Sequence, residues 1–168
     1  MQKSELYDQL PFLSNSVVVQ DEPHSLTVLI NHTSSKVSGV KVSFFWGLQM
    51  GRVGEPLITE DQVLSVASLD DLLAHQLKVI LQRAEFKDYF DIASLLKFGM
   101  KLDEGLGYAQ ALFGHTFAPS ESIKALNYFG DGDLHLLSKE DKGLLMKKSK
   151  LINKVPLKNI ISRNLSII

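Results

Sequence analysis

The sequence of 168 residues contains no cysteine, which excludes a disulfide framework, a thiol nucleophile and a zinc site with cysteine ligands. No apolar segment approaches the roughly 20 residues that a membrane-spanning helix needs. The first 16 residues lack the basic region and the apolar run of a signal peptide. We therefore expect a soluble, cytoplasmic protein with no membrane partner. A hydrophobic content of 45% is enough for one buried core.

A strong overall charge is also missing, because the formal net charge is only −1. The charge is nevertheless distributed unevenly along the chain. Residues 1–133 carry 10 Lys and Arg against 17 Asp and Glu, whereas residues 134–168 carry 8 against 2. The basic C-terminal region could bind phosphates, pair with the acidic body or face water, and the sequence leaves these alternatives open.

The first 67 residues carry the pattern of β-strands, rich in Val, Phe and Thr and separated by Pro, Ser and Gly. Strands are expected at residues 16–20, 25–31, 37–45 and 63–67. Segments 26–31 and 40–45 are expected to pair. In the second of these, alternation gives one strongly apolar face and places Lys41 and Ser43 together on the other. The apolar face is expected to comprise Val40, Val42, Phe44 and Trp46.

From Ser68 onward the hydrophobic spacing is helical. Ser68 with Asp71, and Ser138 with Asp141, have the spacing of capping boxes, which begin a helix by satisfying free backbone amides. Helices are expected at residues 68–82, 88–98 and 103–113, from Pro119 to before Gly130, and from Ser138 to before Pro156. The fold class is therefore α+β, with a sheet region over 1–67 and a C-terminal bundle of about five helices over 68–168. The basic tail has enough Ile and Leu to dock on the body or on a partner.

Polar residues fall within the apolar stripes of the first two expected helices. Gln76 and Arg83, seven residues apart, project within the stripe of the first helix. That stripe comprises Leu69, Leu72, Leu73, Leu77, Ile80 and Leu81. In the second helix, Asp88 and Asp91 lie one turn apart on the side shared with Ile92 and Leu95, close in sequence to Arg83 and Lys87. This pattern predicts a small charged constellation beside the core.

Each of these residues has a structural interpretation and a functional one. Asp88 could be only an N-cap, with Asp91 three residues later completing a weaker capping box, although capping does not explain a core-side position for Asp91. Gln76 fits a satisfied core amide better than a ligand. Arg83 is expected to pair with Asp88 or Asp91, which would serve equally to hold two helices together or to position a phosphate.

Two other candidate sites are excluded or left without a role. Residues 131–133 begin like a calcium loop, but the sixth position is Leu136 and the twelfth is Lys142, where such a loop needs Gly and Glu. We expect a helix-capping turn there instead. The five histidines show no metal-ligand spacing, and we assign them no role. They are His24, His32, His75, His115 and His135.

The run RAEFKDYFDIASLL, preceded by VASLDDLLAHQLKVILQ, resembles the C-terminal helical part of the nucleotidyltransferase-like AbiEii/AbiGii toxin family. This family is known from abortive-infection and type IV toxin-antitoxin systems. GVKVSFFWG is similar to the strand that precedes that helical part, and ALNYFGDGDLHLL to a late segment in one branch of the family. Together these segments cover most of residues 26–137.

The resemblance implies a polymerase-β-like nucleotidyltransferase sheet followed by a helical bundle. It also implies transfer of nucleotides from a nucleoside triphosphate, with Mg²⁺, to an acceptor such as RNA. Arg83, Lys87, Asp88 and Asp91 match the family's Arg-x-x-x-Lys-Asp-x-x-Asp pattern. By this resemblance Asp91 and Asp88 are candidate catalytic residues, and Arg83, Lys87 and Gln76 are candidate nucleotide-binding residues.

The sequence departs from the family pattern in its metal-binding half. The Gly-Ser turn and the Asp-x-Asp strand of the family would lie upstream of residue 1, so residues 1–67 correspond to a truncated sheet. Ser43 stands where the family strand can carry a third carboxylate, and Gln76 where its first bundle helix carries an inward Lys. We therefore expect no metal ligand from this chain, and a protein that is inactive or incomplete as a transferase by itself.

The alternative function is a non-catalytic module that binds protein or RNA through the helical bundle and its basic region, residues 139–163. Expected partners are an antitoxin, a separately supplied N-terminal segment, or RNA. We also expect self-association, because a sheet without the family's first strands leaves an unpaired edge that proteins usually cover.

Overall fold

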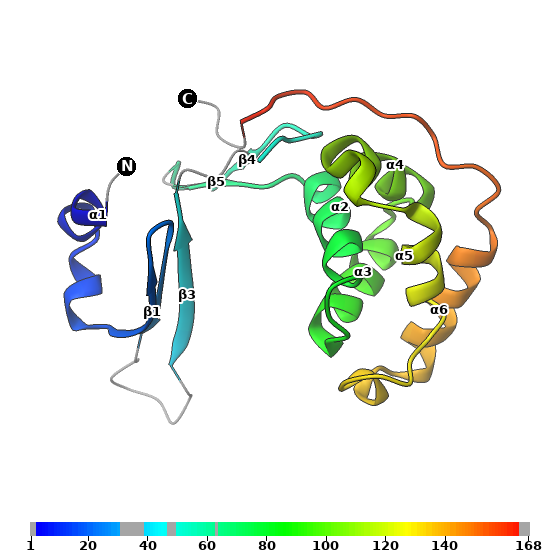
Figure 1. Cartoon of the computed structure of the whole chain (residues 1–168), viewed down its shortest axis with the longest axis horizontal. Helices are drawn as coiled ribbons and strands as arrows, with labels where there is room; N and C mark the ends of the chain where they lie inside the picture. Colours follow the sequence, from blue (N-terminus) through cyan, green and yellow to red (C-terminus); the bar gives the residue numbers. More distant parts are fainter. Residues whose placement is uncertain (1–2, 31–38, 47–49, 63, 165–168) are drawn as a thin grey trace. The chain divides into compact units, whose positions relative to one another are not determined.

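The computed structural model describes residues 3–30, 39–46, 50–62 and 64–164 (Figure 1). The chain forms two compact units, Met1–Gln49 and Met50–Ile168. The second unit contains a short β-hairpin as well as the helices. The fold is therefore mixed α and β, with a small antiparallel sheet in the first unit. None of the helices in the described part of the chain combines the length and the apolar character that crossing a bilayer requires.

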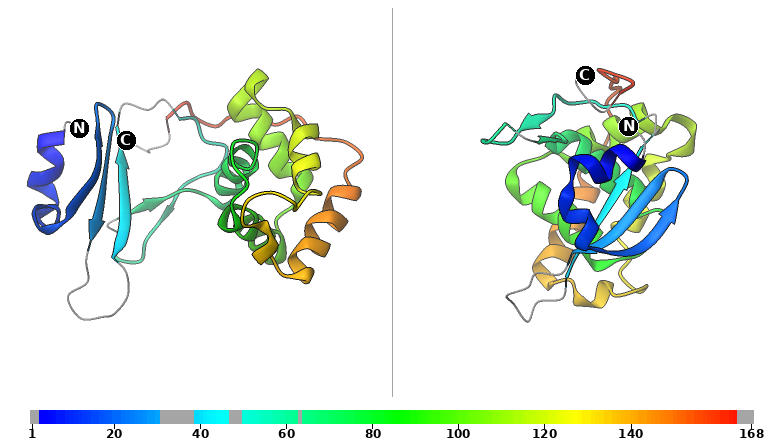
Figure 2. Two further views of the ribbon diagram at one scale, coloured as in Figure 1. Left: turned by 60° about the horizontal axis from the view of Figure 1, so that its bottom comes forward. Right: turned by 90° about the vertical axis from the view of Figure 1, so that its left-hand side faces the viewer.

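The first unit is a three-stranded antiparallel sheet with one face covered by helical turns (Figures 1 and 2). Its elements are α1 (Lys3–Gln9), the 3₁₀ helix η1 (Pro11–Asn15), β1 (Val17–Glu22), β2 (Ser25–Ile30) and β3 (Val40–Phe45). Leu26 and Val28 of β2 are fully buried against Leu6 and Leu13 of the helical turns. The strand pattern did not predict α1 and η1, which supply the other half of this small core.

The predicted pairing of β2 with β3 is confirmed, with Val28 opposite Val42. The expected strand 16–20 lies instead at Val17–Glu22 and pairs with β2 as far as Glu22, with a register shift at a bulge between Val18 and Gln20. The ends of the other two expected strands, residues 31 and 37–38, lie outside the described residues.

The two faces of β3 differ as predicted, with one correction. Val42, Phe44 and Trp46 pack against the buried cluster, but Val40 is 61% exposed, because it lies at the strand end beyond the helical cover. On the other face the hydroxyl groups of Ser43 and Thr27, directly opposite each other in the ladder, form a hydrogen bond of 2.9 Å. Ser43 is thus satisfied within the sheet.

The second unit begins with a short hairpin and continues as helices. Its strands are β4 (Leu57–Ile58) and β5 (Ser65–Val66), so the expected strand 63–67 is shorter than predicted, and Val63 lies outside the described residues. The helices are α2 (Leu69–Val79), α3 (Phe86–Phe98), α4 (Leu102–Phe113), η2 (Gly114–Thr116), α5 (Pro119–Ala125), η3 (Leu134–Leu136) and α6 (Lys139–Lys150). The five α-helices from α2 to α6 match the predicted number.

Capping by a side chain or by glycine explains some of the helix ends. Ser68 and Ser138 accept hydrogen bonds from the backbone amides of Asp71 and Asp141, which confirms both predicted capping boxes. Gly99 ends α3 with a left-handed φ of 112°. The expected boundaries are wrong at several ends. α2 stops at Val79 and gives way to turns, and α3 begins at Phe86, two residues before Asp88. α5 stops at Ala125 and α6 at Lys150, several residues before Gly130 and Pro156.

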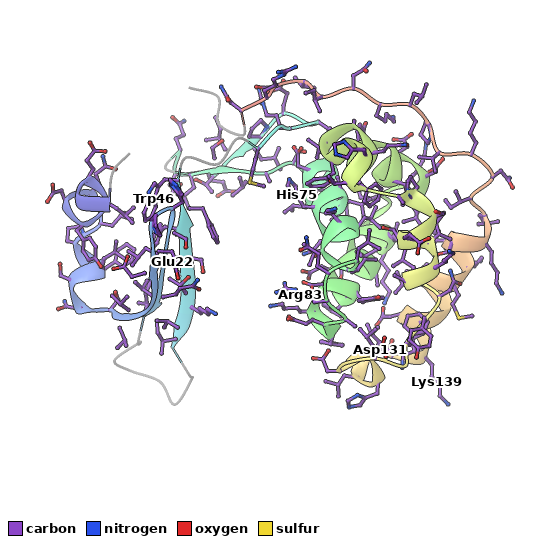
Figure 3. All side chains as sticks on the ribbon, in the orientation of Figure 1. Glu22, Trp46, His75, Arg83, Asp131 and Lys139 are labelled. Carbon is purple, nitrogen blue, oxygen red and sulfur yellow. The ribbon has the colours of Figure 1, made fainter. Side chains whose placement is uncertain are left out.

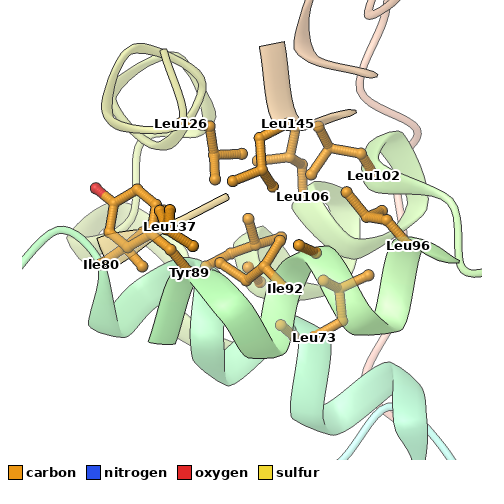
Figure 4. Close-up of a cluster of buried hydrophobic side chains, with 14 of the residues drawn as sticks. Leu73, Ile80, Tyr89, Ile92, Leu96, Leu102, Leu106, Leu126, Leu137 and Leu145 are labelled. Atoms are coloured by element: carbon orange, nitrogen blue, oxygen red, sulfur yellow. The ribbon is translucent and has the colours of Figure 1, made fainter. Parts of the chain in front are cut away.

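A single hydrophobic core fills the space between the helices of the second unit (Figure 4). The fully buried leucines and isoleucine at its centre are Leu73, Leu77, Ile92, Leu106, Leu126 and Leu145. The predicted stripe of α2 is correct for Leu73, Leu77 and Ile80, but Leu72 is 42% exposed because it lies 100° around the helix from Leu73.

The C-terminal tail packs against its own unit. This confirms one of the two predicted alternatives, docking on the body. The backbone of Ser162 forms a bridge with Arg52, in which the Arg52 amide donates to the Ser162 carbonyl at 2.9 Å. Lys158 lies over the ring of Tyr108, with Nζ 4.6 Å from the ring centroid. The tail therefore ties the segment before the hairpin to α4.

The turn at residues 131–133 caps a helix that is remote in the sequence. The Asp133 carboxylate accepts a hydrogen bond from the backbone amide of Phe86, the first residue of α3. The backbone of Gly132, with a φ of 54°, lies so close to the Ala84 carbonyl that a side chain has no room. The prediction of a capping turn is confirmed, although the capped helix is α3.

Candidate functional site

Six side chains from α2, α3 and the loop between them form one polar cluster, near the labelled Arg83 in Figure 3. The polar cluster comprises Gln76, Arg83, Glu85, Lys87, Asp88 and Asp91. All five residues singled out from the sequence belong to it. Glu85 was not singled out.

Arg83 and Asp88 form a bidentate ion pair. Arg83 Nε lies 2.8 Å from Asp88 Oδ2, and Arg83 Nη2 lies 3.1 Å from Asp88 Oδ1. The Asp88 side chain is only 3% exposed, whereas that of Arg83 is 46% exposed. The hydrogen bonds that Arg83 donates to Asp88 are the main reason that the pKa of Arg83 is raised. The pair therefore neutralises a buried carboxylate and leaves one edge of the guanidinium facing outward.

Glu85 connects the two cations of the cluster. One of its carboxylate oxygens lies 3.4 Å from Arg83 Nη1, and the other lies 3.1 Å from Lys87 Nζ. Lys87 is more exposed than Arg83, and Glu85 itself is half-exposed. The Arg-x-Glu-x-Lys spacing could have predicted this bridge, because it places an acid between two bases at the start of a helix.

Gln76 and Asp91 form the second contact between α2 and α3. Gln76 Nε2 donates a hydrogen bond of 3.0 Å to Asp91 Oδ2. Gln76 Oε1 is buried, and no donor among the described residues reaches it. The interpretation of Gln76 as a fully satisfied core amide is therefore wrong, because only its amide nitrogen has a partner.

Both aspartates of α3 were expected on the core side, but only Asp88 lies there. Tyr89, Ile92, Ala93 and Leu96 form the buried face of α3. Asp88 lies at the edge of this face and is buried, while Asp91 lies 100° from Ile92 and is exposed. The expected core-side placement of Asp91 is wrong. The N-cap interpretation of Asp88 is also wrong, because the N-cap is Glu85 and the first amide of the helix is capped by Asp133.

The surroundings of Asp91 in the cluster make its carboxyl group hold a proton more strongly than usual. Partial burial of the carboxyl group raises the pKa of Asp91, and the negative charge of Asp88 raises it further, while Lys87 acts in the opposite direction. The cluster contains three acids and two bases. Asp91 has an oxygen available for a ligand, while both oxygens of Asp88 are held by Arg83.

An aspartate of α2, Asp71, has a different role. Asp71 is 1% exposed and accepts hydrogen bonds from the backbone amides of Val53 at 2.7 Å and Gly54 at 3.2 Å. The Ser68 hydroxyl donates to it at 2.6 Å. A Cβ at Gly54 would lie 2.1 Å from Ser68 Oγ, so only glycine fits there. Asp71 therefore anchors residues 53–54 to the start of α2.

The described residues do not assemble a magnesium site. Among them, no group of three or more His, Asp or Glu side chains lies close enough to hold a metal ion. Ser43, at the position of a possible third carboxylate, is hydrogen-bonded to Thr27. The chemistry that the cluster itself can provide is recognition of an anion by Arg83 and Lys87, and acceptance of a hydrogen bond by Asp91.

No protein-family model matches this chain, and neither a curated protein nor a solved structure matches it significantly.

Proposed function

We propose that this chain is a nucleotidyltransferase-like protein of the AbiEii/AbiGii type, whose polar cluster forms the helical half of a nucleoside triphosphate site. The observation that carries the proposal is the convergence of Gln76, Arg83, Asp88 and Asp91, from two helices and the loop between them, into two direct contacts. Under this proposal the sheet of the first unit corresponds to part of a nucleotidyltransferase sheet. The described residues supply no metal-binding group, so the proposal concerns the helical half of the site alone.

Phosphate recognition is assigned to Arg83 and Lys87. Both side chains already contact a group that is negatively charged like a phosphate, because the Glu85 carboxylate lies between them. Surface ion pairs of this kind contribute only about 0–1 kcal/mol. A triphosphate carries more negative charge than one carboxylate, so it can displace Glu85 while Asp88 continues to hold the Arg83 guanidinium in place.

Asp91 is assigned to a hydroxyl group of the nucleotide or the acceptor. Its raised pKa and its free oxygen suit a group that accepts a hydrogen bond and then a proton. Gln76 fixes the orientation of the carboxylate through the 3.0 Å hydrogen bond. No transfer step is assigned to this chain alone, since its described residues do not fit a magnesium site.

Calorimetric titration of the purified chain with each nucleoside triphosphate and magnesium tests the proposal. We expect saturable binding that Arg83→Gln weakens at least tenfold, because a charge-assisted hydrogen bond contributes roughly 1.5–3 kcal/mol. Glu85→Gln is expected to tighten binding by removing the competing carboxylate. Lys101→Gln is the matched control, since Lys101 is an exposed lysine near a helix start that pairs with Glu104.

Absence of binding at millimolar nucleotide in the wild-type chain would contradict the proposal. The alternative, a non-catalytic interaction module built on the bundle, would then be the better account. Self-association stays a prediction; the exposed valines of the edge strand β1, Val17, Val18 and Val19, support it.

A further inference from the structure

Helix α6 has two faces of opposite character. Asp141, Leu145 and Ser149 follow at steps of four residues and are buried. The inward face is also held by an ion pair of 2.8 Å between Asp141 and Lys97 of α3. The outward face carries six exposed residues, Lys139, Glu140, Gly143, Met146, Lys147 and Lys150, of which Glu140 pairs with Lys97 at 3.2 Å. Four of the six follow one another at steps of four, four and three, and we call these four the lysine face. The lysine face comprises Lys139, Gly143, Lys147 and Lys150.

The three lysines of this face form no ion pair with any described residue, in contrast to Lys97, Lys101 and Lys124 elsewhere in the bundle. Attraction to the helix dipole explains a lysine in the last turn of a helix, which is the position of Lys147 and Lys150. It does not explain Lys139, the first residue of α6, where a positive charge is unfavourable. Stabilisation of the fold therefore does not explain the presence of all three lysines. Figure 3 labels Lys139 at this end of the helix.

Gly143 lies in the middle of the lysine face without a steric reason. A Cβ there would meet nothing within 4 Å, and the residue does not have a positive φ. The other glycines of the second unit have a reason. Gly99, Gly114 and Gly132 have positive φ, and Gly51, Gly54, Gly105, Gly107 and Gly130 have a neighbour that a Cβ would press. A mid-helix glycine is less stable than alanine, so Gly143 costs stability and leaves bare helix backbone between lysines.

One aromatic ring, that of Phe129, lies against the N-terminal half of this helix. Lys142 Nζ lies 5.8 Å above the ring of Phe129. The preceding residue, Tyr128, is 59% exposed. Proteins that bind single-stranded nucleic acid combine lysines, which contact the phosphates, with exposed aromatic rings on which bases stack. Tyr128 is the exposed ring next in sequence to the residue that contacts α6.

Other partners fit the lysine face less well. A second copy docking through the same face would bring lysines against lysines. A membrane-surface helix turns its apolar face to the lipid, but the apolar face of α6 is buried in the core. Phosphates of a nucleic acid complement the charge, and the bare backbone at Gly143 allows them a close approach.

We infer that the lysine face binds the sugar-phosphate backbone of RNA with unpaired bases, with Gly143 as the point of closest approach and Tyr128 as a stacking platform. The choice of RNA rests on the proposed function, in which the acceptor is an RNA. The lysine face is a surface separate from the polar cluster, which none of its residues joins.

Fluorescence anisotropy of a single-stranded RNA oligonucleotide with the full chain, over a range of salt concentrations, tests the inference. The combined change Lys139→Gln, Lys147→Gln and Lys150→Gln should weaken binding at least tenfold. It should also lower the slope of log affinity against log salt by about 2, since each lost phosphate contact removes roughly 0.7. The matched control removes three other lysines, Lys41, Lys101 and Lys124, and should leave most of the binding intact.

The variant Gly143→Gln tests RNA binding without a loss of folding stability. Glutamine is a better helix former than glycine, so the melting temperature should not fall, yet RNA affinity should fall several-fold because the side chain covers the bare backbone. Unchanged RNA binding by this variant would overturn the inference. Equal affinity for duplex DNA of the same length, or binding of poly-glutamate in place of RNA, would also overturn it.

The triphosphate titration distinguishes this inference from the proposed function. The lysine variant is expected to keep nucleotide binding at the polar cluster, and Arg83→Gln is expected to keep RNA binding at α6. If either variant lost both nucleotide binding and RNA binding, the assignment of two separate surfaces would be contradicted.

Discussion

Two aspartates, Asp71 near the start of α2 and Asp91 on α3, show how the same side chain serves two purposes. Asp71 is buried, and both of its oxygens accept hydrogen bonds from Val53, Gly54 and Ser68. Asp91 is exposed, and its hydrogen-bond partner among the described residues is Gln76. A carboxylate whose oxygens are all used by the chain holds the fold, while one with a free oxygen and a raised pKa can take a ligand.

The largest expected effect is on the free energy of unfolding, when Asp71 is replaced. Asp71→Asn should lower the free energy of unfolding by about 3 kcal/mol, because a buried charge-assisted acceptor is lost and an amide hydrogen is forced against a backbone N–H or the Ser68 hydroxyl. Urea denaturation of the wild type and the variant measures this. A change below about 0.5 kcal/mol, the range of ordinary surface substitutions, would show that the anchor is not needed for folding.

The dependence of stability on pH gives a smaller effect with a sign that differs between sites. Lys97 and Ser138 lower the pKa of Asp141 from its ordinary value of 3.8, so its contribution to stability is present above that pH and is lost as the pH falls through the lowered value. For Asp91 the raised pKa has the opposite consequence, since the folded chain favours the protonated acid and loses stability as the pH rises through that value.

Unfolding curves between pH 2 and pH 7 on the wild type, Lys97→Met and Asp91→Asn are expected to separate the two contributions. The stability difference between wild type and Lys97→Met should shrink toward acid pH, whereas Asp91→Asn should gain relative to wild type as the pH rises. Parallel curves for all three proteins would contradict both pKa assignments.

Local spacing was sufficient to predict part of this architecture. The capping boxes at Ser68 and Ser138 depend on residues three positions apart, and the β2–β3 register follows from alternation along each strand. The pairing of Arg83 with Asp88 follows from a separation of five residues. In each case the partners are brought together by one element or one short loop.

Contacts between distant segments could not be predicted in this way. The bond from Val53 to Asp71 spans 18 residues and that from Phe86 to Asp133 spans 47, and neither belongs to a repeating pattern. The burial of Asp88 and exposure of Asp91 depend on which residues of α3 meet the core, and half-buried Leu95 shifted the predicted face toward Asp91.

The most direct test of the central claim is to measure Asp91→Asn by urea unfolding and by triphosphate calorimetry on the same preparation. The account predicts a free energy of unfolding within about 0.5 kcal/mol of the wild type at neutral pH, as for an exposed substitution, together with at least a tenfold loss of nucleotide affinity. A clear loss of stability with nucleotide affinity unchanged would show that Asp91 is a brace between α2 and α3 and would contradict the account.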